Sequence, residues 1–147
     1  MFFRFTSAWQ QISRQEQLSD LPVSVIIPFR NEEKNLKRLA KGLAQQSHEN
    51  FELIFVDDHS DDEGPELLLK YLKGQSLTFR LFRLDESTGK KAAITKGVQE
   101  SRNALIVTTD ADCYMDANWL RSMVAQFENE QIHLVSGPVS LIKNSRM

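Results

Sequence analysis

Acidic side chains follow two apolar segments of the chain at the points where those segments end. Asp58 follows residues 51–56, and Asp110 and Asp112 follow residues 104–109. Two aspartates one residue apart, directly after a strand, suit a hard divalent cation such as Mg²⁺ or Mn²⁺ that bridges to a diphosphate. The pair is weak evidence alone, because a loop acid beside a helix-capping acid gives the same pattern.

A third group of candidate residues follows the first apolar segment, residues 23–27. Pro28 is expected to end that segment, and Glu32 comes four residues later. In a parallel sheet the carboxyl ends of all strands lie at one edge, so these three strand ends predict a crevice lined by several carboxylates. Uncompensated, such carboxylates repel one another and raise one another's pKa. A divalent cation or a bound donor group would relieve that cost.

The elements that must position these residues alternate along the chain. Strands are predicted at 23–27, 51–56, 77–84, 104–109 and 132–135, the last continuing at 139–142 after a bend at Gly137 and Pro138. Helices are predicted from Asn31 or Glu32 to about 43, and over 63–73, 90–102 and 116–128. This alternation predicts an α/β fold with a mostly parallel central sheet and helices on both faces. Segment 77–84 carries Arg80 and Arg83 among its apolar residues, which places this strand near an edge.

Composition narrows the class of protein. The net charge of −2 gives no electrostatic case for a nucleic-acid partner. Cys113 is the only cysteine, so no intrachain disulfide forms, which favours a reducing, cytoplasmic compartment. Residues 1–21 are predicted to be an N-terminal tail or linker, and two interpretations of their aromatic start stay open: a tail, or the end of a membrane helix with aromatic residues at the interface. The second would place the chain at the cytoplasmic face of a membrane.

Four motifs together carry a family resemblance. They are VSVIIPFRNE at 23–32, VDDHSD at 56–61, GKKAAI at 89–94 with Gly97, and TDAD at 109–112. In type, order and spacing they resemble family 2 glycosyltransferases over about residues 22–142. The resemblance implies a Rossmann-like GT-A fold for 22–147, a nucleotide-diphosphate sugar donor, most simply a UDP-sugar, and a divalent metal, Mn²⁺ or Mg²⁺.

The resemblance also implies roles for individual residues. Pro28 and Glu32 would line the nucleoside pocket, Asp58 would accept a hydrogen bond from the base, Lys90 and Asp110 would lie near the donor, and Asp112 would bind the metal. The chemistry suits these roles. A base imide N–H needs an acceptor, and a lysine in the first turn of a helix opposes the helix dipole unless an anion is near. His59 and Cys113 are expected to be structural, and Arg30 to be at the surface.

The acceptor side of the reaction is expected to lie elsewhere. Members of the family use a carboxylate general base downstream of the fifth strand, and no acid lies between Val135 and Met147. We therefore expect no catalytic base here and interpret the chain as the donor-binding half of a GT-A domain, truncated at its C-terminal side. The parent protein would transfer the sugar, with inversion, to a hydroxyl of a glycan, lipid or other acceptor, and the isolated piece would be inactive. Membrane association would come through the parent.

Other classes fit less well. A nucleotidyltransferase is the nearest alternative enzyme, but it would carry a glycine-rich basic loop after the first strand. A P-loop needs glycine where Leu84 stands and a hydroxyl where Lys91 stands. A dinucleotide-binding oxidoreductase lacks its glycine fingerprint, and a receiver domain would have its acidic pair after the first strand. A non-catalytic sugar-nucleotide-binding fragment or pseudoenzyme stays open beside the glycosyltransferase.

Overall fold

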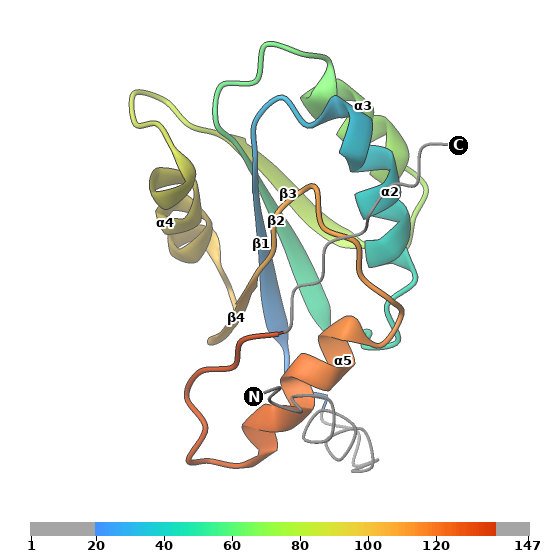
Figure 1. Cartoon of the computed structure of the whole chain (residues 1–147), viewed down its shortest axis with the longest axis vertical. Coiled ribbons are helices and arrows are strands. Elements are labelled where there is room, and N and C mark those ends of the chain that lie inside the picture. Colours follow the sequence, from blue (N-terminus) through green and yellow to red (C-terminus); the bar gives the residue numbers. More distant parts are fainter. Residues whose placement is uncertain (1–19, 138–147) are drawn as a thin grey trace, which may run out of the picture.

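The fold is a three-layer α/β arrangement around a parallel sheet (Figure 1). The computed structural model describes residues 20–137. Its elements, in chain order, are β1 (Val23–Phe29), α2 (Glu33–Ala44), β2 (Phe51–Asp57), α3 (Gly64–Leu72), β3 (Thr78–Arg83), α4 (Lys90–Glu100), β4 (Leu105–Thr108), α5 (Trp119–Val124) and a 3₁₀ turn, η1 (Ala125–Glu128). Residues 1–19 of the tail or linker predicted at 1–21 lie outside the described residues, as do residues 138–147.

Strand β1 lies inside the sheet and is buried along its whole length. The described strands run in the order β3-β2-β1-β4, and every neighbouring pair is parallel. Val23 is the register partner of Phe51 on one side and of Leu105 on the other, so three strands start level. The prediction of an edge position for β3 is confirmed. β4, predicted to be buried, has only Val107 buried.

Alternate side chains of the strands divide the core into two layers. On one face, Ile26, Ile54 and Val56 pack against Ala93 of α4. On the other face, β1 and β2 residues pack with the apolar residues of α2, α3 and α5. Figure 1 shows α4 separated by the sheet from α2 and α3. The prediction of helices on both faces is therefore confirmed.

Pro28 does not end its strand, contrary to the sequence prediction. It pairs with Val56 inside β1, which continues to Phe29. The carbonyl of Ile26 accepts a hydrogen bond from Thr109 N, on the β4 side. Backbone groups alternate sides along a strand, so the nitrogen of Pro28 faces that same side, just past the end of β4. The proline therefore removes no donor that the sheet uses.

The region after β4 differs most from the prediction. The helix expected at 116–128 is divided into α5 and η1. Asp116 does not cap it directly; its carboxylate accepts a hydrogen bond from Asn118 N, and Asn118 is the capping residue. Residues 132–137 form no strand, and Leu134 is 87% exposed. A short apolar run forms a strand only where a neighbour offers backbone partners, and no described strand pairs with it. The continuation at 139–142 lies outside the described residues.

An ionic network lies at the amino-terminal edge of the sheet. Buried Glu52 accepts hydrogen bonds from Ser24 Oγ at 2.6 Å and from Arg80 at 2.8 Å, and it also accepts one from the amide of Arg102. Burial raises the pKa of Glu52, but these hydrogen bonds outweigh it and hold that pKa below its ordinary value. The carboxylate therefore stabilises the fold above its unfolded pKa, and that stabilisation is lost as the pH falls through the lower folded value.

No helix in the described part of the chain is long and apolar enough to cross a membrane.

Gly97 marks the closest approach of α4 to the sheet, and this generates a stability prediction. A Cβ at Gly97 would collide with Cγ2 of Ile26, whereas a Cβ at Gly42 in α2 would lie 3.4 Å from Cγ of the flexible Met115. Gly97→Ala should lower the free energy of unfolding by about 1–2 kcal/mol, because overpacking outweighs the better helix propensity of alanine. Gly42→Ala should be neutral or stabilising by up to about 1 kcal/mol. Urea unfolding measures both, and equal effects of the two substitutions would contradict the packing described here.

Candidate functional site

A small cavity lies at the carboxyl-terminal edge of the sheet. Its volume is about 280 Å³, and it is lined by Pro28, Phe29, Arg30, Glu32, Asp58, Lys90, Ala93, Asp110, Ala111 and Asp112. The six residues that the sequence analysis singled out are therefore brought together in one place. They come from the ends of β1, β2 and β4 and from the start of α4.

The register of the sheet accounts for this convergence. Phe29 at the end of β1 is level with Asp57 of β2, and the amide of Asp58 donates to the carbonyl of Phe29 at 2.9 Å. On the other side, β4 is level with β1 up to Thr108. Asp58 and Asp110 therefore lie just beyond the strands on either side of β1.

Asp58 is held from two directions. It is only 8% exposed, and its Oδ2 accepts a hydrogen bond from Gly89 N at 2.9 Å. Gly89 has a φ of +91°, a conformation that glycine adopts without the strain that a Cβ would add. Oδ1 of Asp58 lies 3.2 Å from Nδ1 of His59. The carboxylate is therefore fixed in place before any ligand binds.

Glu32 is positioned by contacts between the segments that follow β1 and β2. The side-chain Oδ1 of Asn31 accepts a hydrogen bond from the backbone N–H of Asp61. The backbone N–H of Asn31 donates to Ser60 Oγ. Asn31 has a φ of +55°, which asparagine tolerates better than most residues do. Glu32 follows at the start of α2 and accepts a hydrogen bond from Asn35 Nδ2 at 2.6 Å. These contacts tie the β1–α2 loop to the end of β2.

Lys90 and Asp110 form an ion pair across the cavity. Nζ of Lys90 lies 2.6 Å from Oδ1 and 2.8 Å from Oδ2 of Asp110. Their side chains are 62% and 48% exposed, so water reaches both. The pair joins the first turn of α4 to the loop after β4. Asp110 therefore places a negative charge beside a lysine in the first turn of a helix, where the helix dipole disfavours an unpaired cation.

Asp112 lies at the exposed rim of the cavity, and its carbonyl accepts a hydrogen bond from Arg38 at 2.9 Å. Within residues 20–137, no group of three or more His, Cys, Asp or Glu side chains is arranged to hold a metal ion. Mg²⁺ and Mn²⁺ bind readily through one or two carboxylates when phosphate oxygens and water supply the other ligands. The carboxylate of Asp112 fits a metal that arrives with a diphosphate.

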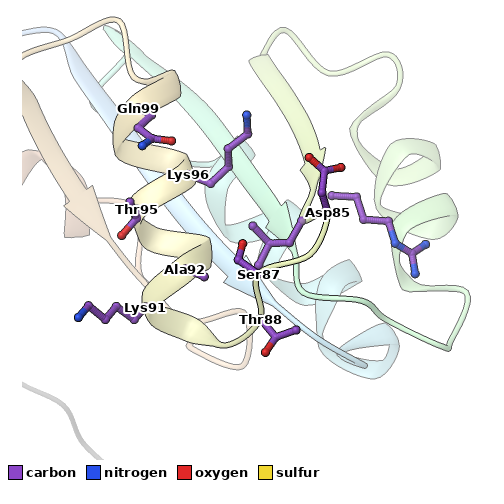
Figure 2. A pocket seen from close by; sticks show the side chains of 10 residues that line it. Asp85, Ser87, Thr88, Lys91, Ala92, Thr95, Lys96 and Gln99 are labelled. Carbon is purple, nitrogen blue, oxygen red and sulfur yellow. The ribbon is translucent and has the colours of Figure 1, made fainter.

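A larger hollow of about 590 Å³ lies on the other side of α4's first turn, against the loop that follows β3 (Figure 2). Its basic side chains do not converge on it. Lys91 extends away from Ser87 and Thr88, and Lys96 is paired with Glu100 at 2.7 Å. We therefore assign the chemistry of this chain to the smaller cavity.

His59, which was expected from the sequence to be structural, contacts one of the residues that line the cavity. Its Nε2 lies 2.7 Å from the carbonyl of Asp85, in addition to the contact of Nδ1 with Asp58. The hydrogen bond with the Asp85 carbonyl and that with Asp58 raise the pKa of His59 above its ordinary value. The sequence offered little to reveal this, because Asp85 is distant along the chain and contributes only a backbone atom.

Comparisons with known proteins identify what this chain is similar to. The family model described as "Glycosyl transferase family 2" matches residues 24–146. The chain is 31% identical to a dodecaprenyl-phosphate galacturonate synthase of Rhizobium johnstonii, over 83% of this chain and 37% of that protein. It superposes on residues 1–349 of TarS of S. aureus in complex with UDP with a TM-score of 0.66 and 25% identity, over 84% of this chain and 40% of that solved chain.

A second solved structure agrees in fold. The mannosyltransferase PcManGT of Pyrobaculum calidifontis, in complex with GDP-Man and Mn²⁺, has a TM-score of 0.71 and 20% identity, over 85% of this chain and 40% of that one. These neighbours confirm the predicted GT-A fold. The chain spans about two fifths of the length of the relatives it matches.

The exposure of the Lys90–Asp110 pair predicts that it matters little for stability. Lys90→Ala and Asp110→Asn should each change the free energy of unfolding by less than about 1 kcal/mol, because water screens exposed ion pairs. Urea unfolding of both variants beside the unsubstituted protein measures this. A loss of several kcal/mol in either variant would mean that the pair supports the fold rather than being free to serve a ligand.

Proposed function

Because this chain belongs to glycosyl transferase family 2, we propose that the cavity at the carboxyl-terminal edge of its sheet binds a nucleotide-diphosphate sugar. One observation carries the proposal. Six residues from four separate segments, all of them within the family's motifs, line that single cavity. A carboxylate-rich rim alone would repel a diphosphate, so the proposal includes a divalent cation, Mn²⁺ or Mg²⁺.

The nucleoside end of the donor is assigned to the side of the cavity formed by β1 and β2. Asp58 accepts a hydrogen bond from an N–H of the base, since each of its oxygens has a lone pair beyond the contact it already makes. Pro28 and Glu32 line the same pocket. Uracil is the base we propose, in line with the UDP complex of TarS, a solved neighbour that is 25% identical.

The diphosphate is assigned to the opposite side, near β4 and the start of α4. Asp112 holds the metal with the phosphate oxygens, and Asp110 lies toward the ribose or the sugar. Lys90 is paired with Asp110 and can also approach the phosphate, because most of its side chain is exposed. The cation bound at Asp112 would stabilise the negative charge that develops on the departing nucleoside diphosphate. Transfer with inversion at the anomeric carbon is part of the proposal.

The acceptor side is proposed for the longer protein rather than for these residues. We assign no residue of this chain as a catalytic base, and we expect the chain alone to bind donor without transferring sugar. The name of the Rhizobium relative includes a polyprenyl phosphate, which makes a lipid phosphate one candidate acceptor beside a glycan or lipid hydroxyl. A phosphate oxygen needs little deprotonation at neutral pH, so such an acceptor would not require a base. A lipid phosphate acceptor would also bring the rim of the cavity to the cytoplasmic face of a membrane.

Calorimetry with UDP and GDP, in the presence and absence of Mn²⁺, tests the proposal. We expect UDP binding that strengthens when Mn²⁺ is added. Asp112→Ala should remove the metal-dependent part, and Asp58→Ala should weaken binding about tenfold or more, since it removes an acceptor that serves a buried donor. Asp116→Asn is the matched control, because Asp116 lies in the same loop and asparagine keeps its hydrogen bond with the amide of Asn118.

Two results would contradict the proposal. One is the failure of both nucleotides to bind folded protein at millimolar concentration. The other is an equal loss of binding in Asp112→Ala and in the Asp116→Asn control. A general change in the loop, rather than the loss of a metal ligand, would then explain the effect of Asp112→Ala.

A further inference from the structure

His59 connects the proposed base-binding carboxylate to the loop that follows β3. Its Nδ1 lies 3.2 Å from Oδ1 of Asp58, and its Nε2 lies 2.7 Å from the carbonyl oxygen of Asp85. The loop continues past Ser87 and Thr88 (Figure 2) and returns to Asp58 at Gly89, whose amide donates to Oδ2. The loop is therefore fastened to Asp58 at both of its ends, once through His59 and once directly. We refer to the two contacts of the imidazole as the His59 bridge.

The two partners of the bridge specify the protonation state of the ring. A backbone carbonyl and a carboxylate can only accept hydrogen bonds. Neutral imidazole has one N–H, so it can satisfy one of these acceptors, and its other nitrogen then presents a lone pair to the second. Only the imidazolium form donates to both. An acceptor beside each ring nitrogen therefore favours the protonated form of His59.

The groups around His59 favour the protonated form of its ring on balance. The hydrogen bond with the Asp85 carbonyl and then that with Asp58 raise the pKa of His59, while partial desolvation and the guanidinium of Arg83 oppose them. Arg83 is held nearby, with its Nε 3.6 Å from buried Asp57 and its terminal nitrogen donating to the carbonyl of Ser60. Because the carbonyl of Asp85 belongs to the loop, protonation of His59 is coupled to the position of the loop.

The backbone of His59 also has an unusual conformation. Its φ is +58°, in the left-handed region that residues with a Cβ seldom adopt. Glycine would take this conformation without strain. The two hydrogen bonds of the imidazole, which glycine could not make, accompany the strained conformation at this position.

We propose that protonated His59 is a positioning residue, which fixes the carboxylate of Asp58 and the Asp85–Gly89 loop so that nucleotide binds more tightly when His59 carries its proton. The inference rests on the proposed function of this cavity, because it assigns His59 to the same donor site. His59 does not touch the donor; it acts through Asp58. Its effect is therefore on affinity and on the pH dependence of affinity.

The sign of the pH dependence follows from the bridge. The pKa of His59 is raised in the folded protein, so the bridge is fully formed below the unfolded pKa and is lost as the pH rises through the folded value. Deprotonation leaves one N–H for two acceptors, so the ring keeps its hydrogen bond with Asp58 or with the Asp85 carbonyl but not with both. Loss of either contact opens the link between Asp58 and the loop, and where Nδ1 loses its proton, its lone pair faces Oδ1 of Asp58 and repels the carboxylate.

The test is calorimetric titration with UDP-glucose and GDP-mannose at pH 6.0 and pH 8.5, in the presence of Mg²⁺. The diphosphate of a nucleotide sugar has no proton to lose over this range, so a change in affinity reports on the protein. The unsubstituted protein should bind about fivefold or more weakly at pH 8.5, at the lower end of typical couplings between sites. His59→Gly, which suits the backbone and removes the ring, should bind with nearly the same affinity at both pH values. His133→Gln, at an exposed position, should keep the original pH dependence.

A second measurement needs no nucleotide. In the ligand-free protein, the ¹⁵N resonances of the His59 ring should report both nitrogens protonated at pH 6.0. They should titrate with a midpoint above 6.5, the ordinary pKa of histidine, and the amide resonance of Gly89 should move with the same midpoint. His59→Asn, which tolerates the left-handed backbone, stands in if the glycine variant does not fold, and it should likewise lose the pH dependence of affinity.

The outcomes separate the inference from the function on which it rests. Absence of binding by both nucleotide sugars at either pH would overturn the proposed function, and the role of His59 in affinity with it. Binding with the same pH profile in the unsubstituted protein and in His59→Gly would overturn the inference alone. A His59 ring with a single protonated nitrogen at pH 6.0 would do the same.

Discussion

Repulsion between like charges is the constraint on which this site depends. Parallel strands in register place the residues after β1, β2 and β4 at one edge, and the sequence puts acids there. The fold compensates part of this charge with its own groups: Gly89 N and the ring of His59 contact Asp58, and Lys90 pairs with Asp110. Asp112 is exposed where it lines the cavity. A cation bound with an anionic ligand would complete the compensation.

The opposite edge of the same sheet provides the contrast. There Glu52 is buried and accepts hydrogen bonds from Ser24, Arg80 and the amide of Arg102. This carboxylate is compensated entirely within the protein, its pKa is lowered, and it joins β1, β2 and β3. A buried and fully partnered acid serves the fold, whereas an exposed acid at the end of a strand is available to a ligand. The two edges differ in burial and in partners, although both are rich in charge.

Much of this could be predicted from the sequence, because local patterns determine it. The apolar segments at 23–27 and 51–56 predicted β1 and β2, the alternation of strands with helices predicted a parallel sheet, and parallel topology then required the acids to meet. The predictions failed where contacts with distant segments of the chain determine the local structure. Pro28 stays in its strand because β4 ends beside it, and 132–137 form no strand beside the described sheet. The contact of His59 with the carbonyl of Asp85 leaves no trace in residue types, because any residue offers a carbonyl.

The most direct test of the account is paramagnetic broadening of assigned amide resonances when Mn²⁺ is added with UDP, with Mg²⁺ and UDP as the diamagnetic reference. Broadening falls steeply with distance from the metal, so it locates the cation. The account predicts that the amides of Gly89, Asp110 and Cys113 broaden strongly, while those of Glu52 and Arg102 at the other edge remain sharp. Broadening centred on the larger hollow beside α4, around Thr95, or the same weak broadening throughout the chain, would contradict the claim that the rim of the smaller cavity holds the metal and the diphosphate.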